Sequence, residues 1–228
     1  MTQIDKFNLT EKFILLAMHP DKARYKISDQ ALNAGLIGAI LLDLTKEDKL
    51  LIKNKMLQAK SSYSKMSATH NQILSIIQQS EKERNIKIWI QKLSMKSGTY
   101  RKKILEGLRD KGLIKIEYKK FLFIPYLNAY LIKKNERINL INQIREILIY
   151  SKKPDTEMAS LLGMVEACKM YPIIARDRTE RKDFQKKLKE IIKSDLIASG
   201  VDQVIKEMQA AITAAVMVST MAATSGSR

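Results

Sequence analysis

The chain has 228 residues, 45% of them hydrophobic, which is enough to bury a substantial core. Its single cysteine, Cys168, excludes a disulfide framework, and we expect it to be a buried small hydrophobic residue. The formal net charge is +17, and residues 81–150 alone carry 17 basic and 7 acidic groups. This positive field predicts an anionic partner, either nucleic acid or an anionic lipid surface.

Only eight glycines and four prolines interrupt the chain, and apolar residues recur at spacings of three and four between them. This pattern predicts helices over residues 9–19, 28–45, 68–80, 85–95, 100–111, 134–150, 155–175, 179–197 and 200–222. In the second of these, Gly35 and Gly38 are spaced for close helix packing. Trp89, on an amphipathic helix, is interpreted as a core residue.

The sequence predicts β-strands in two places. Leu50–Ile52 predicts a short extended segment after the second helix. Gly112–Glu117 alternates apolar and polar residues and faces Phe121–Ile124 across Tyr118–Lys120, so we expect a β-hairpin whose second strand is closed by Pro125. The expected fold class is therefore all-α, a single compact, mostly helical domain over residues 1–228 with a protruding β-hairpin. Residues 1–8 are expected to be a short N-terminal extension and residues 223–228 a frayed tail.

The segment Met208–Ser227 contains no charged residue and is long enough to span a bilayer. It is rich in Ala, Thr and Ser, which favour insertion little, so we expect a packed terminal helix and not a membrane anchor. The first six residues lack the pattern of a secretory signal, which predicts a cytoplasmic protein.

The helix at 100–111 and the hairpin after it have three interpretations. In the first, Ile86–Leu93 and Tyr100–Lys111 form a helix-turn-helix, the hairpin is the wing of a winged helix, and Arg101, Lys102, Lys103 and Arg109 contact nucleic acid. In the second, the hairpin touches a membrane, with cations on phosphates and apolar side chains at the acyl boundary. Its membrane-contact residues are Lys119, Lys120, Phe121, Leu122 and Phe123. In the third, the apolar face of the hairpin merely covers the helical core.

Several short motifs occur in a definite order. They are Leu9–Met18, Gly35–Gly38 followed by Leu41–Leu44, Ile88–Leu93, Ile104–Ile114 and Ala159–Ala167. This ordered set resembles the Golgi phosphoprotein 3 family from Leu9 to about Ala222. Members of that family are peripheral membrane proteins with one mostly helical domain, and in eukaryotes they read a phosphoinositide headgroup and hold Golgi enzymes in place. The resemblance implies a membrane-surface adaptor that is not an enzyme and has no cofactor.

The eukaryotic members bind phosphatidylinositol 4-phosphate through a tryptophan and three arginines. Carried over position by position, one arginine is retained as Arg101, while the other two fall on Ile37 and Gly98 and the tryptophan falls on Ser28. The resemblance therefore implies a degraded headgroup site around Arg101, in which nearby cations compensate in part. Those cations are Arg24, Lys26, Lys102 and Lys103.

The implied partners are an anionic phospholipid or phosphoinositide headgroup, cytoplasmic tails of other proteins, and a second copy of the chain through the hairpin. Nucleic acid is the alternative. The departures at the headgroup site and the lysine-rich composition suggest a bacterial relative that is peripheral to the cytoplasmic face of the membrane.

Catalysis has little support in the sequence. His19 and His70 are far apart and lack a nucleophile signature, so each is expected to be a surface or capping residue. Asp43 lies among leucines, which favours a structural, hydrogen-bonded carboxylate. No spacing typical of metal ligands occurs around Cys168.

Overall fold

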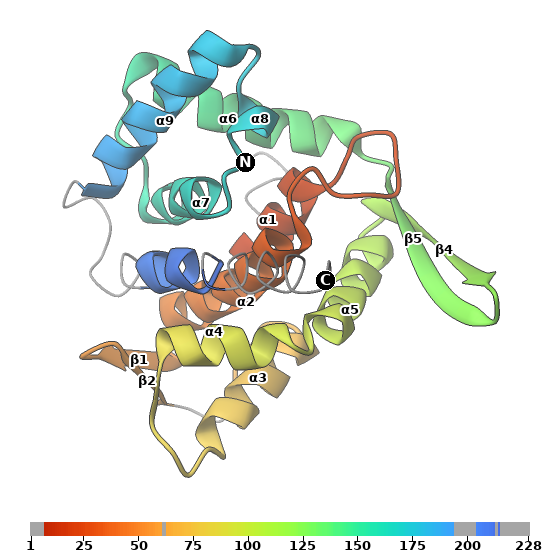
Figure 1. Ribbon diagram of the computed structural model, residues 1–228, viewed down its shortest axis with the longest axis vertical. Coiled ribbons are helices and arrows are strands. Elements are labelled where there is room, and N and C mark those ends of the chain that lie inside the picture. The colour runs from red at the N-terminus through yellow and green to blue at the C-terminus, as the bar shows by residue number, and fades with distance from the viewer. Residues whose placement is uncertain (1–6, 61–62, 194–203, 213, 215–228) are drawn as a thin grey trace, which may run out of the picture.

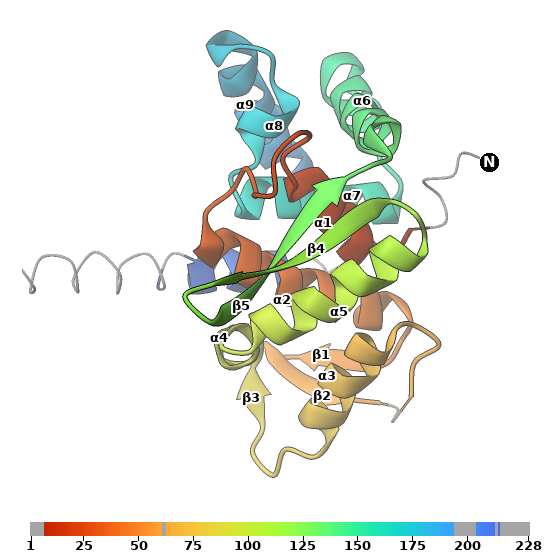
Figure 2. The same cartoon turned by 90° about the vertical axis from the view of Figure 1, so that its right-hand side faces the viewer.

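Two central helices, α1 (Leu9–Ala17) and α2 (Asp29–Lys46), are buried along almost their whole length and form the middle of the molecule (Figure 1). The computed structural model describes residues 7–60, 63–193, 204–212 and 214. Its other helices are α3 (Ala68–Gln78), α4 (Ile86–Ser94), α5 (Ser97–Asp110), α6 (Lys134–Tyr150), α7 (Thr156–Ala167), α8 (Tyr171–Ile174) and α9 (Arg178–Lys193), with a further helical segment at residues 204–212. One side of α1 and α2 is covered by α6 to α9, and the other side by α3 to α5 (Figures 1 and 2).

The N-terminus of α1 is capped twice. Asn8 and Glu11 form a capping box, and the carboxylate of Asp43 on α2 accepts hydrogen bonds from the backbone N–H groups of Leu9 and Thr10 at 3.0 and 2.9 Å. A carboxylate at this position also complements the helix dipole. The expectation that Asp43 is a structural carboxylate is confirmed.

His70 is fully buried beside this cap, with its Nε2 atom 3.2 Å from the Asp43 carboxylate and its Nδ1 atom 2.8 Å from the Ser67 hydroxyl. Of the two expected roles, surface or capping, the surface role is wrong for His70, whose ring lies beside the carboxylate that caps α1. The ring lies between α1, α2 and α3, where Asp43 of α2 and Ser67, the residue before α3, supply partners for its two nitrogens.

Glycines allow the central helices to approach closely. A Cβ atom on Gly35 would lie 2.4 Å from Phe13 and 2.8 Å from the sulfur of Cys168, and one on Gly38 would lie 2.3 Å from the sulfur of Met208. The predicted roles of Gly35 and Gly38 in packing are confirmed, as is the burial of Cys168 and Trp89.

Most of the predicted helices exist with small changes at their ends, but the helix expected at 155–175 is divided. It ends at Ala167, Lys169 has a positive φ of 54°, and the short α8 follows with Pro172 near its start. A left-handed residue and a proline both end a helix, which explains the division.

The fold is mostly helical but not purely all-α, because it contains two small antiparallel sheets. The segment expected at Leu50–Ile52 is strand β1 (Leu50–Lys53), which pairs with β2 (Met56–Ala59), and β2 pairs with β3 (Arg84–Asn85). The sequence analysis missed β2 and β3. The two-residue turn Asn54–Lys55 was the available signal, since Asn is common in such turns.

The predicted hairpin exists, but its register was wrong. Strands β4 (Ile114–Phe121) and β5 (Ile124–Leu131) pair from Ile114–Leu131 to Phe121–Ile124, so the turn is Leu122–Phe123 and not Tyr118–Lys120. Pro125 lies inside β5, opposite Lys120, and does not close the strand. A two-stranded ribbon has free edges, where a proline is tolerated.

At the C-terminal end, the segment at 204–212 packs into the core through Val204, Ile205 and Met208. The remainder of the helix predicted at 200–222, the tail at 223–228 and residues 1–6 lie outside the described residues. Phe7 and Asn8, expected to belong to an extension, are respectively a buried core residue and the cap of α1. Within the described ranges, no helix combines the length and apolarity needed to cross a bilayer.

Candidate functional site

A cavity of about 340 Å³ lies where the hairpin leaves the body of the protein, between residues 18–25, α5 and β5. The residues that line it are Met18, Ala23, Arg24, Tyr25, Gly98, Arg101, Lys102, Leu105, Tyr126, Leu127 and Ala129. It therefore brings together three of the five cations expected at the headgroup site, namely Arg24, Arg101 and Lys102.

The loop after α1 is held in a defined shape. Met18 and Tyr25 form an isolated antiparallel bridge, and the Lys26 N–H donates to the Ala17 carbonyl at 2.8 Å. Asp21 at the far end of the loop forms an ion pair with Lys134 of α6 at 2.6 Å, and this hydrogen bond lowers the pKa of Asp21. These contacts place Arg24 opposite α5.

Arg101 is half-buried on α5 and points into the space between the loop and α2. Its guanidinium carbon is 5.5 Å from the centre of the Tyr25 ring, and it donates to the Asn33 side chain at 3.4 Å. Burial raises the pKa of Tyr25 to about 12, although the charge of Arg101 acts in the opposite direction. The Tyr25 hydroxyl thus stays protonated near neutral pH and can donate a hydrogen bond.

The field inside the cavity is positive. None of the described residues that line it is acidic, and none of Arg24, Arg101 and Lys102 forms an ion pair with a described residue. Desolvation, and then the charges of Arg24 and Lys26, lower the pKa of the neighbouring His19. Two guanidinium groups and one ammonium group can bind a phosphate through charge-assisted hydrogen bonds.

The other residues carried over from the family resemblance lie elsewhere. Lys26 and Lys103 do not line the cavity, and Lys103 donates to Gln72 at 2.9 Å. Ser28 caps α2, and Ile37 has no exposed surface, so neither contributes to the cavity. Gly98 does line it, and a Cβ atom there would meet nothing within 4 Å.

Sequence reasoning missed the aromatic part of the site. Tyr25 and Tyr126 line the cavity together with the cations. Asn33, on α2, accepts a hydrogen bond from Arg101. Tyr25 could have been suspected as the neighbour of Arg24. Asn33 gave no signal, because only the packing of α5 against α2 brings it to Arg101.

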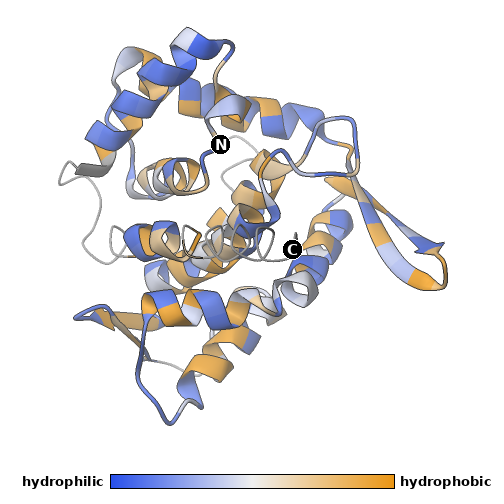
Figure 3. Ribbon diagram, in the orientation of Figure 1, coloured by the Kyte–Doolittle hydropathy of each residue, from blue (hydrophilic) through white to orange (hydrophobic). Residues whose placement is uncertain are grey.

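The outer half of the hairpin projects from the body and is not covered by it (Figures 1 and 2). Phe123 is 97% exposed and Leu122 is 75% exposed, and Figure 3 shows the hydrophobic end of the ribbon standing away from the core. The other large apolar side chains exposed on it are Tyr118, Phe121, Ile124 and Tyr126. The inner end, by contrast, is buried at Ile114 and Leu131. The interpretation in which the hairpin merely covers the core is therefore wrong for its outer half.

The turn itself is unusual in composition. Leu122 and Phe123 both have positive φ angles, 46° and 70°, as a two-residue type I′ turn requires. The turn between β1 and β2 has the same geometry and contains Asn54 and Lys55. Asn and Gly are the residues that tolerate this backbone, whereas a left-handed conformation costs other residues about 1–2 kcal/mol each. The hairpin therefore keeps two apolar side chains at its tip at a cost in stability.

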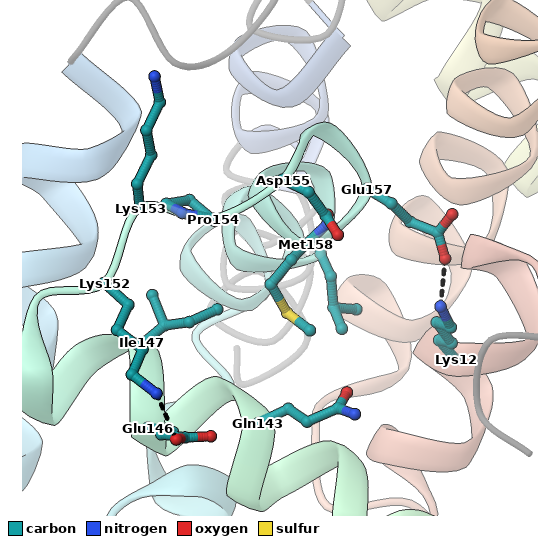
Figure 4. A pocket seen from close by; sticks show the side chains of 11 residues that line it. Lys12, Gln143, Glu146, Ile147, Lys152, Lys153, Pro154, Asp155, Glu157 and Met158 are labelled. Atoms are coloured by element: carbon teal, nitrogen blue, oxygen red, sulfur yellow. Dashed lines mark hydrogen bonds and ion pairs between the residues drawn. The ribbon is translucent and has the colours of Figure 1, made fainter. Parts of the chain in front are cut away.

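A second cavity, of about 370 Å³, lies between α1, α6 and α7 and is also lined by lysines (Figure 4). Its charges are already matched, since Lys12 pairs with Glu157 and Lys152 with Glu146. Although burial acts to raise the pKa of Glu157, the ammonium groups of Lys12 and Lys46 lower it overall. This cavity therefore offers no unpaired cluster of cations to an anion.

Among the described residues, no group of three or more His, Cys, Asp or Glu side chains could hold a metal ion. The buried pair of His70 and Asp43 belongs to the helix cap described above. The chemistry that the described cations and apolar side chains support is the binding of anions beside an apolar surface.

Comparison with known proteins identifies a family. The family model for Golgi phosphoprotein 3 (GPP34) matches residues 9–208, and no curated protein matches the chain. The match starts at the first residue of α1 and includes the cavity, the hairpin and most of the helical segment at 204–212. The chain therefore belongs to the Golgi phosphoprotein 3 family.

Proposed function

We propose that this protein is a peripheral membrane adaptor that docks onto anionic bilayers through the tip of its hairpin and binds a lipid headgroup in the cavity at the hairpin's base. The family is not known as an enzyme family, and we propose a binding role without catalysis. The single observation that carries this proposal is the exposed Leu122–Phe123 turn.

The apolar tip is of the kind that enters a bilayer interface. A soluble protein gains nothing from holding Leu and Phe in a left-handed turn that faces water, whereas insertion of these side chains to the acyl boundary removes their apolar surface from water. Lys120, two residues from the turn, forms no ion pair with a described residue, and Lys119 is 3.5 Å from Glu117. Both lysines are placed to meet phosphates once the tip is inserted.

The spacing along the hairpin supports a joint action of tip and cavity. Tyr126 lines the cavity and lies three residues from Phe123, a separation of about 10 Å along a strand. An interfacial segment buries its apolar groups about 5–10 Å deep. The cavity would then lie at the level of the headgroup phosphates while the tip reaches the acyl boundary.

The decisive experiment exchanges the turn for the sequence that its backbone prefers. The variant L122N/F123G removes both apolar side chains while keeping the hairpin. Sedimentation with phosphatidylcholine vesicles containing about one-fifth phosphatidylserine should show affinity at least about tenfold lower, because loss of two inserted side chains forfeits several kcal/mol. The matched control is Lys55→Gly in the turn between β1 and β2, which should leave binding unchanged.

Charge at the hairpin is tested separately. Lys119→Glu combined with Lys120→Glu should weaken binding to the same vesicles at physiological salt, since each cation near an anionic surface contributes about 1 kcal/mol. Unchanged sedimentation of both hairpin variants would remove the hairpin from the mechanism.

A second candidate is a nucleic-acid-binding protein, because α4, α5 and the β4–β5 hairpin follow one another in the order of a winged helix. Two observations argue against nucleic-acid binding. Arg101 on α5 faces Tyr25 and Asn33, and Arg109 is paired with Asp110 at 2.8 Å. Steep salt-dependent retention on duplex DNA without vesicle binding would favour this second function.

The partners proposed on family grounds are cytoplasmic tails of membrane proteins and a second copy of this chain paired through the hairpin. A location at the cytoplasmic face of a membrane, and a bacterial source, are proposed on the same grounds.

A further inference from the structure

Helix α9 carries a row of cations on the face that is turned away from the core. Arg178, Lys182, Lys186 and Lys189 are all exposed. At 100° per residue they fall within an arc of about 80°, and they extend over about 16 Å of the helix. We call these four residues the α9 stripe.

Two of the three carboxylates of α9 are engaged outside the stripe, and the third, Glu190, is exposed at its edge, one turn from Lys186. Glu180 accepts two hydrogen bonds from Arg145 of α6, and Asp183 pairs with Lys187 at 3.3 Å. No member of the stripe forms an ion pair with a described residue. The members of the stripe therefore form no close ion pair, but Glu190 offsets part of their charge and Lys189 acts electrostatically on the Glu166 carboxylate of α7.

The stripe is presented rigidly. Phe184 and Leu188, on the opposite face of α9, are almost fully buried against the neighbouring helices, and the guanidinium of Arg145 lies 5.5 Å from the centre of the Phe184 ring. The apolar face of this amphipathic helix is thus used by the core and is not available for insertion into a bilayer. An anionic partner of the stripe would be held by charge alone.

The position of α9 relative to the hairpin determines which partner can reach the stripe. In Figure 1 the hairpin leaves the molecule on the right, whereas α9 lies at the upper left, beyond α1 and α7. Since Phe184 and Leu188 are buried against the neighbouring helices, the stripe lies on the outer surface at this end of the molecule, far from the hairpin. A bilayer bound by the hairpin therefore leaves the stripe open to a second partner.

We infer that the α9 stripe is a second anionic-surface site, which lets one protein molecule bridge two negatively charged bilayers. This inference rests on the function proposed above for the hairpin. A flat bilayer is the partner that fits best, because all four cations of a straight, convex helix can face a plane of headgroups at once. A convex duplex would meet fewer of them, and the stripe contains no aromatic side chain on which bases could stack.

The test uses the full chain and vesicles of phosphatidylcholine with about one-fifth phosphatidylserine. The variant K182E/K186E/K189E reverses three charges of the stripe. Its matched control is K65E/K82E/K96E, which makes the same change in net charge at exposed lysines just before α3, β3 and α5. Light scattering measures clustering of vesicles, and sedimentation with an excess of vesicles measures attachment to one of them.

The wild-type protein and the control should cluster vesicles, whereas the stripe variant should cluster them at least about tenfold less, because each cation near an anionic surface strengthens attachment about fivefold. The stripe variant should still sediment with vesicles through its hairpin. The neutral variant K182Q/K186Q/K189Q should show a smaller loss in the same direction, and it serves as the test if the charge reversal fails to fold.

Three outcomes would overturn the inference while leaving the hairpin's role intact. These are sedimentation of the wild type without clustering, equal clustering by the stripe variant and the control, and loss of duplex-DNA retention by the stripe variant without any effect on vesicles. A separate outcome concerns the proposed function. If L122N/F123G sediments with vesicles and clusters them as the wild type does, the hairpin does not attach the protein to a bilayer. Bridging between a hairpin-bound and a stripe-bound bilayer is then also wrong.

Discussion

Glu180 and Arg145 form the ion pair that fastens α9 to α6. The buried guanidinium of Arg145 donates to the two carboxylate oxygens of Glu180 at 2.7 and 2.8 Å and to the carbonyl of Ile174 at 2.6 Å. The hydrogen bond from Arg145 lowers the pKa of Glu180 from its ordinary value near 4.5 to about 2, although desolvation opposes the shift. Two parallel hydrogen bonds between a guanidinium and a carboxylate make the pair both strong and geometrically specific.

The variant E180Q should lower the free energy of unfolding by about 3 kcal/mol, because it leaves the Arg145 charge buried without its anionic partner. Chemical denaturation measures this change. The control E190Q, at an exposed position on the same helix, should change stability by less than about 0.5 kcal/mol. Equal effects of the two variants would show that the ion pair is not stabilising.

The same pair predicts how stability depends on pH. Because the pKa of Glu180 is lowered in the folded state, its contribution is fully present above its ordinary pKa and is lost as the pH falls from about 5 to about 2. The loss should be on the order of 2 kcal/mol after allowance for the partial exposure of the carboxylate. Denaturation curves of the wild type and E180Q should therefore converge at low pH, and curves that stay parallel would contradict the prediction.

A substitution at the hairpin tip should raise the stability of the protein while it lowers vesicle binding. In L122N/F123G the turn gains the residues that a type I′ backbone prefers, so the folded protein should be more stable by about 1 kcal/mol even though vesicle binding is lost. Thermal unfolding measures the first effect and sedimentation the second. A variant that loses both stability and binding would indicate that Leu122 and Phe123 support the fold.

A cation added at Gly98 should strengthen headgroup binding. A side chain there meets nothing within 4 Å and lies at the cavity, so Gly98→Arg should tighten binding to vesicles that contain a phosphoinositide by about tenfold, through a bond of about 1.5 kcal/mol to phosphate. Gly107→Arg is the matched control, because Gly107 is equally open but lies about half a turn round the same helix, nine residues away. Equal gains in the two variants would mean that only net charge matters.

Because α1 and α2 approach closely at Gly35, replacing this glycine by alanine should affect stability very differently from the same change at Gly107. Gly35→Ala should destabilise the protein by about 2 kcal/mol, since its Cβ would lie 2.4 Å from the buried Phe13 ring. Gly107→Ala, in an open helical position, should stabilise it by about 0.5–1 kcal/mol. Both are measured by denaturant titration, and a neutral Gly35→Ala would show that the helices can move apart.

The sequence anticipated the elements that depend on local pattern. The spacing of apolar residues located most helices within a few residues, and a glycine followed by alternating residues located the hairpin between α5 and α6. It missed the short strands β2 and β3, because two to four residues carry too little periodicity. It also misplaced the hairpin turn, since Leu122 and Phe123 are residues that turn chemistry disfavours, while Lys119 and Lys120 resembled an ordinary polar turn.

The candidate site was predictable only in part. Arg24, Arg101 and Lys102 were expected together and line one cavity, but the partners Asn33 and Tyr126 come from elements whose proximity depends on packing. The fully buried Ile37 could not be recognised as a core residue from its place in an apolar helix alone, because a helix with apolar residues on every side gives no indication of which face meets solvent.

By itself, the amino-acid sequence determined the helical character, the family, the excess of positive charge and the existence of an apolar ribbon, because each of these depends on composition or on short-range order. Only the tertiary structure decided which cations share a cavity, which are neutralised by carboxylates, and that the α9 stripe lies far from the hairpin. The reason is that ion pairs and exposed faces arise between segments distant in the chain, as Arg145 and Glu180 are, and local periodicity carries no information about such pairings.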